Sequence, residues 1–181
     1  MPRLLDFFPA PLLTTAVRVR PLAPGDVAAA RALLGAESAR HPYAARTLEI
    51  LTAAAAALGA PGAEHRALVA DEGDAVTGVV LYGLVAGTVG AGAIFGLAVA
   101  RDARRRGVGR ALVDAAADAL ATLGGRFAVA ELADDASLGG VAALLASAGF
   151  AEEARASDLV RDGVGLRFLL RPRDRPARRP G

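Results

Sequence analysis

The chain has 181 residues, which is enough for one domain with a substantial hydrophobic core. It has no cysteine, which excludes disulfides, cysteine nucleophiles and thiolate metal sites, and two histidines alone make a zinc site implausible, so we expect no metal. All 21 basic side chains are arginines and the formal net charge is only +2, which is weak evidence for nucleic-acid binding, and we expect none.

The two ends differ in composition from the rest of the chain. Residues 1–15 are apolar but are interrupted by Asp6 and three prolines, and they lack the pattern of a signal peptide. We therefore expect a cytoplasmic protein with an N-terminal arm at 1–15, a domain at 16–172 and a disordered tail rich in arginine and proline at 173–181.

The first half of the domain predicts one strand, two helices and two further strands. Residues 16–22 alternate as a strand, and Pro24-Gly25-Asp26 begins a helix that runs to about Leu34, with Asp26 as its N-cap. A second helix is expected at about 44–58. Strands at 66–70 and 76–85 flank a charged turn at 71–74.

The uncharged run at 75–100 has two interpretations. It is long enough for a membrane-spanning helix, and arginines follow it. However, glycine recurs at 78, 83, 87, 90, 92 and 96, and valine and threonine are frequent, which disfavours a helix. The segment 87–92 divides the run into two pieces of strand length, so the pattern favours a buried hairpin with its second strand at 91–99, and no membrane span.

The second half predicts a helix at 111–123, a strand at 126–132, a helix at 140–148 closed by Gly149, and two strands around the turn Arg161-Asp162-Gly163. The complete order is β-α-α-β-β-β-α-β-α-β-β, which is an α/β (α+β) protein.

The loop between the strand at 91–99 and the following helix predicts a diphosphate site. A helix N-terminus presents unpaired N–H groups and partial positive charge, and Gly107 and Gly109 remove Cβ atoms that would hold a phosphate away. Arg104, Arg105, Arg106 and Arg110 add full charges. A P-loop would need a lysine, which the chain lacks, and the glycine pattern of a dinucleotide loop is absent; the remaining alternative is a solvated basic turn.

The spacing Arg104-x-x-Gly107-x-Gly109 resembles the Arg/Gln-x-x-Gly-x-Gly/Ala signature of the GCN5-related N-acetyltransferases, the GNAT superfamily. Leu97-Ala98-Val99 before the loop, Gly149-Phe150 after the last helix and the order of elements over 16–172 also resemble this family. The resemblance implies a mixed, mostly antiparallel, twisted sheet of about seven strands with about four helices, in which a bulged fourth strand separates from the fifth. It implies acetyl-CoA as co-substrate, bound by Leu97, Val99, Arg104, Arg105, Arg106, Gly107, Val108, Gly109 and Arg110.

The catalytic residues typical of the family are missing. Many relatives place a glutamate on the fourth strand and a tyrosine four residues before the Gly-Phe pair, but 91–100 has no carboxylate and the second position is Leu145. The substitutes are Glu131 as base and Tyr82 as acid, although either residue could be structural. His41 and Tyr43 fall in the segment that shapes the acceptor side in relatives, while Asp134, Asp135 and Ser137 are expected to cap the last helix.

Two functions remain open from the sequence. The first is an acetyl-CoA-dependent N-acetyltransferase that acts on a primary amine of a small molecule or protein. The second is a GNAT-fold module that binds coenzyme A for regulation with little or no catalysis. The resemblance also implies a homodimer through the C-terminal strands or the N-terminal arm.

Overall fold

The computed structural model describes residues 17–38, 46–60, 62–73 and 75–173. The expected N-terminal arm, His41, Tyr43 and all of the expected tail except Arg173 lie outside these residues.

The predicted order of elements is confirmed. The elements are β1 (Arg18–Pro21), η1 (Pro24–Asp26), α1 (Val27–Ser38), α2 (Arg46–Ala56), β2 (Arg66–Glu72), β3 (Ala75–Leu84), β4 (Ala91–Val99), η3 (Arg101–Ala103), α3 (Val108–Thr122), β5 (Phe127–Ala133), η4 (Ala136–Leu138), α4 (Gly139–Ser147), β6 (Ala151–Arg161) and β7 (Val164–Pro172).

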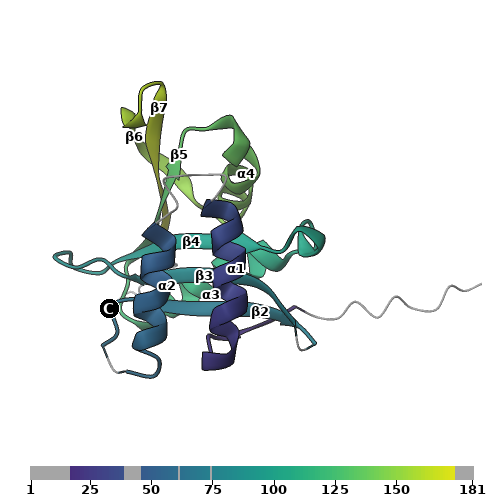
Figure 1. Ribbon diagram of the computed structural model, residues 1–181. Coiled ribbons are helices and arrows are strands. Elements are labelled where there is room, and N and C mark those ends of the chain that lie inside the picture. Colours follow the sequence, from purple (N-terminus) through teal and green to yellow (C-terminus); the bar gives the residue numbers. More distant parts are fainter. Residues whose placement is uncertain (1–16, 39–45, 61, 74, 174–181) are drawn as a thin grey trace, which may run out of the picture.

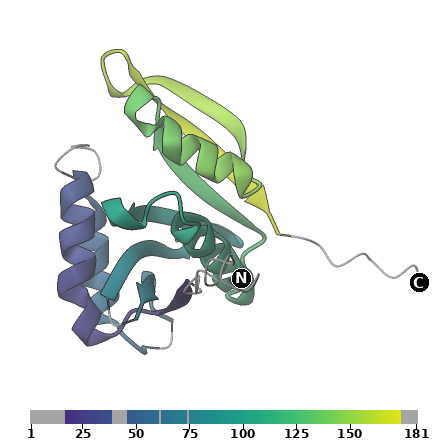
Figure 2. The same cartoon turned by 90° about the vertical axis from the view of Figure 1, so that its right-hand side faces the viewer.

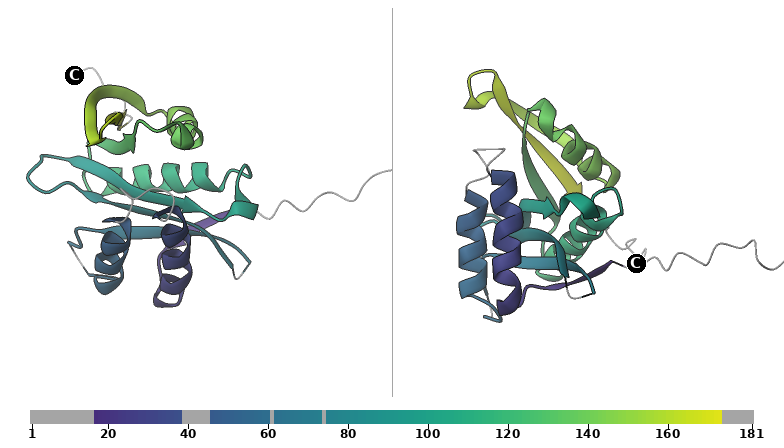
Figure 3. Two further views of the ribbon diagram at one scale, coloured as in Figure 1. Left: turned by 45° about the horizontal axis from the view of Figure 1, so that its top comes forward. Right: turned by 45° about the vertical axis from the view of Figure 1, so that its right-hand side comes forward.

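One seven-stranded sheet, in the order β1-β2-β3-β4-β5-β7-β6, organises the molecule. All neighbouring strands are antiparallel except β4 and β5. Helices α1 and α2 lie together over β2–β4 (Figure 1), and α3 lies on the opposite face of the sheet (Figure 3). Helix α4 lies over β5 and β7 on the same face as α3 (Figure 2).

Two hydrophobic cores result from the alternation of side chains along the central strands. Leu81 on β3 packs with Leu34 and Leu51 in the core under α1 and α2. Its neighbour Val80 faces the other way, into the core with Leu112 of α3. Continuous apolar runs in β2–β4 therefore reflect burial on both faces of the sheet.

The run at 75–100 forms the antiparallel strands β3 and β4, as the hairpin interpretation predicts. Among the described residues, none of the helices has the length and apolar character needed to cross a bilayer. Gly87 and Gly90, in the connection between the strands, have positive φ angles of 76° and 78°, which glycine adopts without strain.

Three local predictions need correction. Helix α3 begins at Val108 rather than 111, so the loop before it is shorter than expected. Strand β2 continues through Glu72, which places Asp71 in the sheet and not in a turn. Asp26 does not cap α1; its carboxylate instead accepts a hydrogen bond from the preceding Ala23 N–H at 2.8 Å.

Asp71 and Asp26 are both buried, and the guanidinium of Arg20 joins them. Its Nε lies 2.6 Å from Asp71 Oδ2 and its Nη1 lies 2.6 Å from Asp26 Oδ2. The hydrogen bonds from Arg20 lower the pKa of Asp26 and outweigh the effect of burial. Burial raises the pKa of Asp71, but hydrogen bonds from Arg20 and Arg18 outweigh it, so this pKa is lowered as well.

Replacing Arg20 by alanine should lower the free energy of unfolding at pH 7 by about 3 kcal/mol, because two buried carboxylates lose their shared partner. A carboxylate with a lowered pKa stabilises the fold above its unfolded pKa of about 3.9, and this contribution is lost as the pH falls through the folded value. In denaturant titrations the deficit of Arg20→Ala should therefore shrink below about pH 4.

Arg31→Ala is the control, because the one hydrogen bond that Arg31 makes to a described residue is the exposed one to Thr52. It should change stability little at either pH. An Arg20→Ala deficit of equal size at pH 7 and pH 3 would contradict the role given to these ion pairs.

Candidate active site

The candidate site begins where β4 and β5 separate. The two strands pair through Ala91–Ile94 and Phe127–Ala130 only. Beyond these residues β4 continues beside β3 to Val99, while β5 continues beside β7 to Ala133. We call this separation the divergence; it leaves one edge of each strand without a strand partner among the described residues.

A bulge in β4 lies at the start of the divergence. Leu81 of β3 opposes Gly96, but the next residue, Tyr82, opposes Ile94, so Phe95 is an extra residue in β4. The bulge reverses the alternation of the two faces along β4, so Phe95 faces the core under α1 and α2. Gly96 faces the same side, toward Thr47. The bulge and the separation of the strands agree with what the family resemblance implies.

Backbone groups of β4 point into the divergence. The Ala100 N–H donates to Thr77 O of β3 at 2.8 Å. Because alternate residues of an antiparallel strand direct their N–H and C=O groups to opposite sides, the groups of Leu97 and Val99 point away from β3, toward β5. The Val99 carbonyl already accepts a hydrogen bond from Arg104 Nε at 3.0 Å.

The loop that follows β4 leads directly to the N-terminus of α3. Gly107 is the N-cap of α3, with φ 86°, and no side chain caps the helix. The first helical hydrogen bond runs from Ala111 N–H to Gly107 O at 2.9 Å, so the N–H groups of Val108, Gly109 and Arg110 precede it. A Cβ added at Gly107 would meet no atom within 4 Å, which leaves room for an anionic group beside these donors.

Gly109 has a different structural role. A Cβ at this position would lie 3.0 Å from Leu144 Cδ2 and 3.6 Å from Val99 Cγ2. The absence of a side chain therefore allows the start of α3 to approach α4 and the end of β4.

The four loop arginines are not equivalent. Arg104 pairs with Glu37 at the end of α1, and Arg106 lies 2.8 Å from Glu72. Arg105 has φ 64° and has no hydrogen-bond or ion-pair partner among the described residues.

Arg110 pairs with Asp114 at 2.5 Å and donates to Ser147 O at 2.8 Å. Burial raises the pKa of Asp114, but hydrogen bonds from Arg110 and Arg171 outweigh it, so its pKa is lowered. Three of the four arginines thus already have carboxylate partners. The contacts of Arg104 and Arg106 hold the loop against α1 and β2, while Arg110 and Asp114 pair within α3.

The two catalytic candidates lie on opposite faces of the sheet. Glu131 follows Ala130, the last residue paired with β4, and faces the side of α1 and α2; it is exposed and has no polar partner in the described part of the chain. Tyr82 is 7% exposed in the core beside α3. Burial raises the pKa of the Tyr82 phenol and outweighs the charge of Arg66, which acts in the opposite direction. The structure does not bring the two candidates together.

Sequence reasoning missed Phe95 and His65. The His65 ring lies edge-on to Phe95, with 5.1 Å between ring centroids, and His65 Nδ1 is buried without a hydrogen-bond partner among the described residues. Only the register of β4 against β3 shows that Phe95 is bulged, and a single sequence carries no signal for that register.

The residues at the end of β5 take structural roles. Asp135 accepts a hydrogen bond from Ser137 N–H at 2.9 Å and is the N-cap of the short helix η4. The predicted cap of the last helix needs correction, because the N-cap of α4 is Leu138 and no side chain caps it. Leu145, at the position of the family's tyrosine, is 4% exposed in the core.

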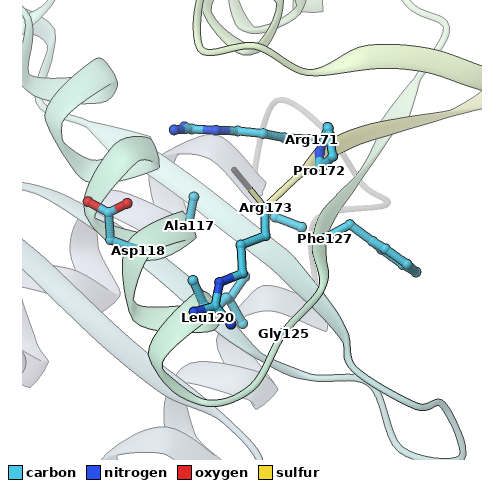
Figure 4. Close-up of a pocket in the computed structure, with 10 residues that line it drawn as sticks. Ala117, Asp118, Leu120, Gly125, Phe127, Arg171, Pro172 and Arg173 are labelled. Carbon is cyan, nitrogen blue, oxygen red and sulfur yellow. The ribbon is translucent and has the colours of Figure 1, made fainter. Parts of the chain in front are cut away.

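A surface pocket lies away from the divergence (Figure 4). It is formed by the second half of α3, the start of β5 and the end of β7, and it includes Leu120, Phe127, Arg171 and Arg173. None of the predicted site residues lines it. In the described residues there is no group of three or more side chains suited to hold a metal ion.

Residues 34–150 match the sequence profile of the acetyltransferase (GNAT) family, so the chain belongs to this family. A comparison with curated proteins gave no match.

Solved structures with the same fold include a GNAT-family protein from Desulfovibrio desulfuricans, with a TM-score of 0.75 and 25% identity over 87% of this chain and 99% of that chain. Another is YncA from Salmonella typhimurium with its cofactor acetyl-CoA, with a TM-score of 0.68 and 21% identity over 90% and 96% of the two chains. A third is the ribosomal-protein-S18-alanine N-acetyltransferase from Escherichia coli, with a TM-score of 0.66 and 18% identity over 91% and 99%.

Proposed function

We propose that the protein is an acetyl-CoA-dependent N-acetyltransferase that acts on a primary amine of a small molecule or protein. One observation carries this proposal: the divergence of β4 and β5 opens toward the uncapped N-terminus of α3. A strand edge with free amide groups suits the amide-containing pantetheine arm, and a helix N-terminus suits a pyrophosphate. Bound acetyl-CoA supplies an activated acetyl thioester.

In this proposal the backbone groups of Leu97 and Val99 bind the pantetheine arm, and the N–H groups from Arg105 to Arg110 bind the pyrophosphate. Arg105 adds a positive charge that has no hydrogen-bond or ion-pair partner among the described residues. Arg104 and Arg106 keep the loop in place through Glu37 and Glu72, and Arg110 pairs with Asp114 within α3. Each of these arginines can exchange its carboxylate partner for a phosphate oxygen.

Glu131 is the base that the geometry favours. A lysine-like amine with a pKa of about 10.4 is neutral in on the order of one molecule in 10³ at pH 7, so a proton must be removed before attack. Glu131 lies at the start of the divergence, on the face opposite α3. No described residue pairs with its carboxylate, so the carboxylate is available to accept this proton. Tyr82 stays a prediction, and its burial on the other face does not favour it as the acid.

A second candidate function is a coenzyme A-binding module without efficient catalysis. The observation that favours it is Leu145, which is buried where many relatives carry the tyrosine. The expected homodimer, the cytoplasmic location, the boundaries of the domain and the absence of nucleic-acid binding stay predictions.

Gly107→Ala should weaken acetyl-CoA binding at least tenfold in calorimetric titration, because its Cβ enters the space beside the helix N-terminus and alanine disfavours a φ of 86°. Gly87→Ala is a matched control: its φ is 76°, its added Cβ also meets no atom within 4 Å, and it lies in the β3–β4 connection. Equal loss of affinity in both variants, or no loss in Gly107→Ala, would refute the phosphate-binding role of this loop.

Glu131→Gln should lower kcat about 100-fold with a panel of primary amines, because it removes the proton acceptor. Its activity should rise with pH as more of the amine becomes neutral, while its affinity for acetyl-CoA should not change. Glu152→Gln on the outer strand β6 is the control and should keep wild-type activity. Wild-type protein that binds acetyl-CoA but acetylates no amine would favour the second candidate function.

A further inference from the structure

The part of the sheet formed by β5, β7 and β6 has one face without a described helix. Helix α4 covers the other face, where Ala130 and Leu169 lie in the core (Figure 2). The strand registers assign the alternate residues to the face turned away from α4. We call it the open face; it consists of Val129, Glu131 and Ala133 on β5, Leu166, Phe168 and Leu170 on β7, and Ala151, Ala154 and Ala156 on β6.

The open face belongs to neither hydrophobic core. Helices α1 and α2 pack only on the part of the sheet that ends at β4, and their core contains no residue of β5, β6 or β7. Leu166, Phe168 and Leu170 are only half-buried. A partly exposed apolar surface of this kind is typical of a binding surface.

Charge is distributed very unevenly between the two faces. The face toward α4 carries paired charges: Arg155 lies 2.6 Å from Asp134, and Arg167 lies 2.7 Å from Glu152. Among the nine residues assigned to the open face, Glu131 is the one that is charged, and no described residue pairs with it. A lone carboxylate beside an apolar surface attracts a cation, while the surface around it favours an apolar body.

The open face is continuous with the proposed reaction site. Glu131 directly follows Ala130, where β5 leaves β4, and in the register of β5 and β7 it opposes Phe168. A molecule whose nitrogen lies beside Glu131 can therefore extend along Phe168 and Leu170 without leaving the face.

We propose that the acceptor is a primary amine with an apolar body and without a carboxylate near its nitrogen; this rests on the proposed acetyl transfer. The ammonium pairs with Glu131 and gives one proton to that carboxylate or to water. The nitrogen then forms a bond to the acetyl carbon, the carbon–sulfur bond breaks, and the second proton ends on the coenzyme A thiolate. An amino acid is disfavoured because its carboxylate would approach Glu131 and lose hydration against Phe168.

The test compares propylamine, pentylamine and heptylamine with the 2-amino acids of the same chain lengths, which carry a carboxylate next to the amino group. Equilibrium binding to the full chain is measured in the presence of coenzyme A, which allows no reaction, and kcat/KM is measured with acetyl-CoA. Affinity and kcat/KM should rise about two- to fourfold for each added methylene. The amino acids should bind at least tenfold more weakly than the matched amines.

Two variants test the open face, and one neighbouring variant is the control. Phe168→Ala should remove most of the dependence on chain length. Ala154→Arg, on the outer strand opposite Phe168, keeps the core unchanged and should weaken binding of every amine at least fivefold. Arg167→Ala changes the next residue of β7 on the face toward α4 and should leave the series unchanged.

The outcomes separate this inference from the proposed function. Acetylation without dependence on chain length would overturn the inference and leave acetyl transfer intact. Binding that depends on chain length but leads to no acetylation would support the inference and overturn acetyl transfer. If the protein forms dimers that are dissociated by Phe168→Ala or by Ala154→Arg, and if it shows no preference among the amines, the open face binds a second copy of the chain. This result would overturn the inference.

Discussion

Parallel strands stay together only while each satisfies the backbone groups of the other, and β4 and β5 stop doing so after Ile94 and Ala130. The flanking strands make this separation stable, because β3 holds β4 to its end and β7 holds β5 to its end. The bulge at Phe95 increases the local twist of β4 as it leaves its neighbour. The positions of the proposed phosphate loop, Glu131 and the open face all follow from this separation.

The arginines around the loop are also held by contacts with neighbouring elements. A run of arginines would repel itself, but Glu37, Glu72 and Asp114 each hold one of them. Glu37 belongs to α1 and Glu72 to β2, so the loop is held to one layer of helices and to the sheet, while Arg110 and Asp114 pair within α3. A ligand phosphate would therefore meet donors that are already positioned and need little ordering.

Much of the fold could be predicted from the sequence because its patterns are local. The glycines between 87 and 92 marked the hairpin, and the bounds of β4 were correct. The burial of Asp71 could not be predicted, because it depends on pairing with Arg20 from another strand. That Glu131 and Tyr82 lie on opposite faces of the sheet could not be predicted either. Which face each residue occupies depends on strand register and on the bulge, and shifting a register by one residue exchanges the faces.

The most direct test of the divergence as the coenzyme site is the response of individual backbone amides to acetyl-CoA in nuclear magnetic resonance spectra. We expect the largest shifts on titration at Leu97, Val99 and Val108–Arg110, and small changes at Val79 and Val80 of β3, which lies on the side of β4 away from the divergence. Shifts concentrated instead around Phe127, Arg171 and Arg173, which border the pocket at the far end of α3, would contradict it.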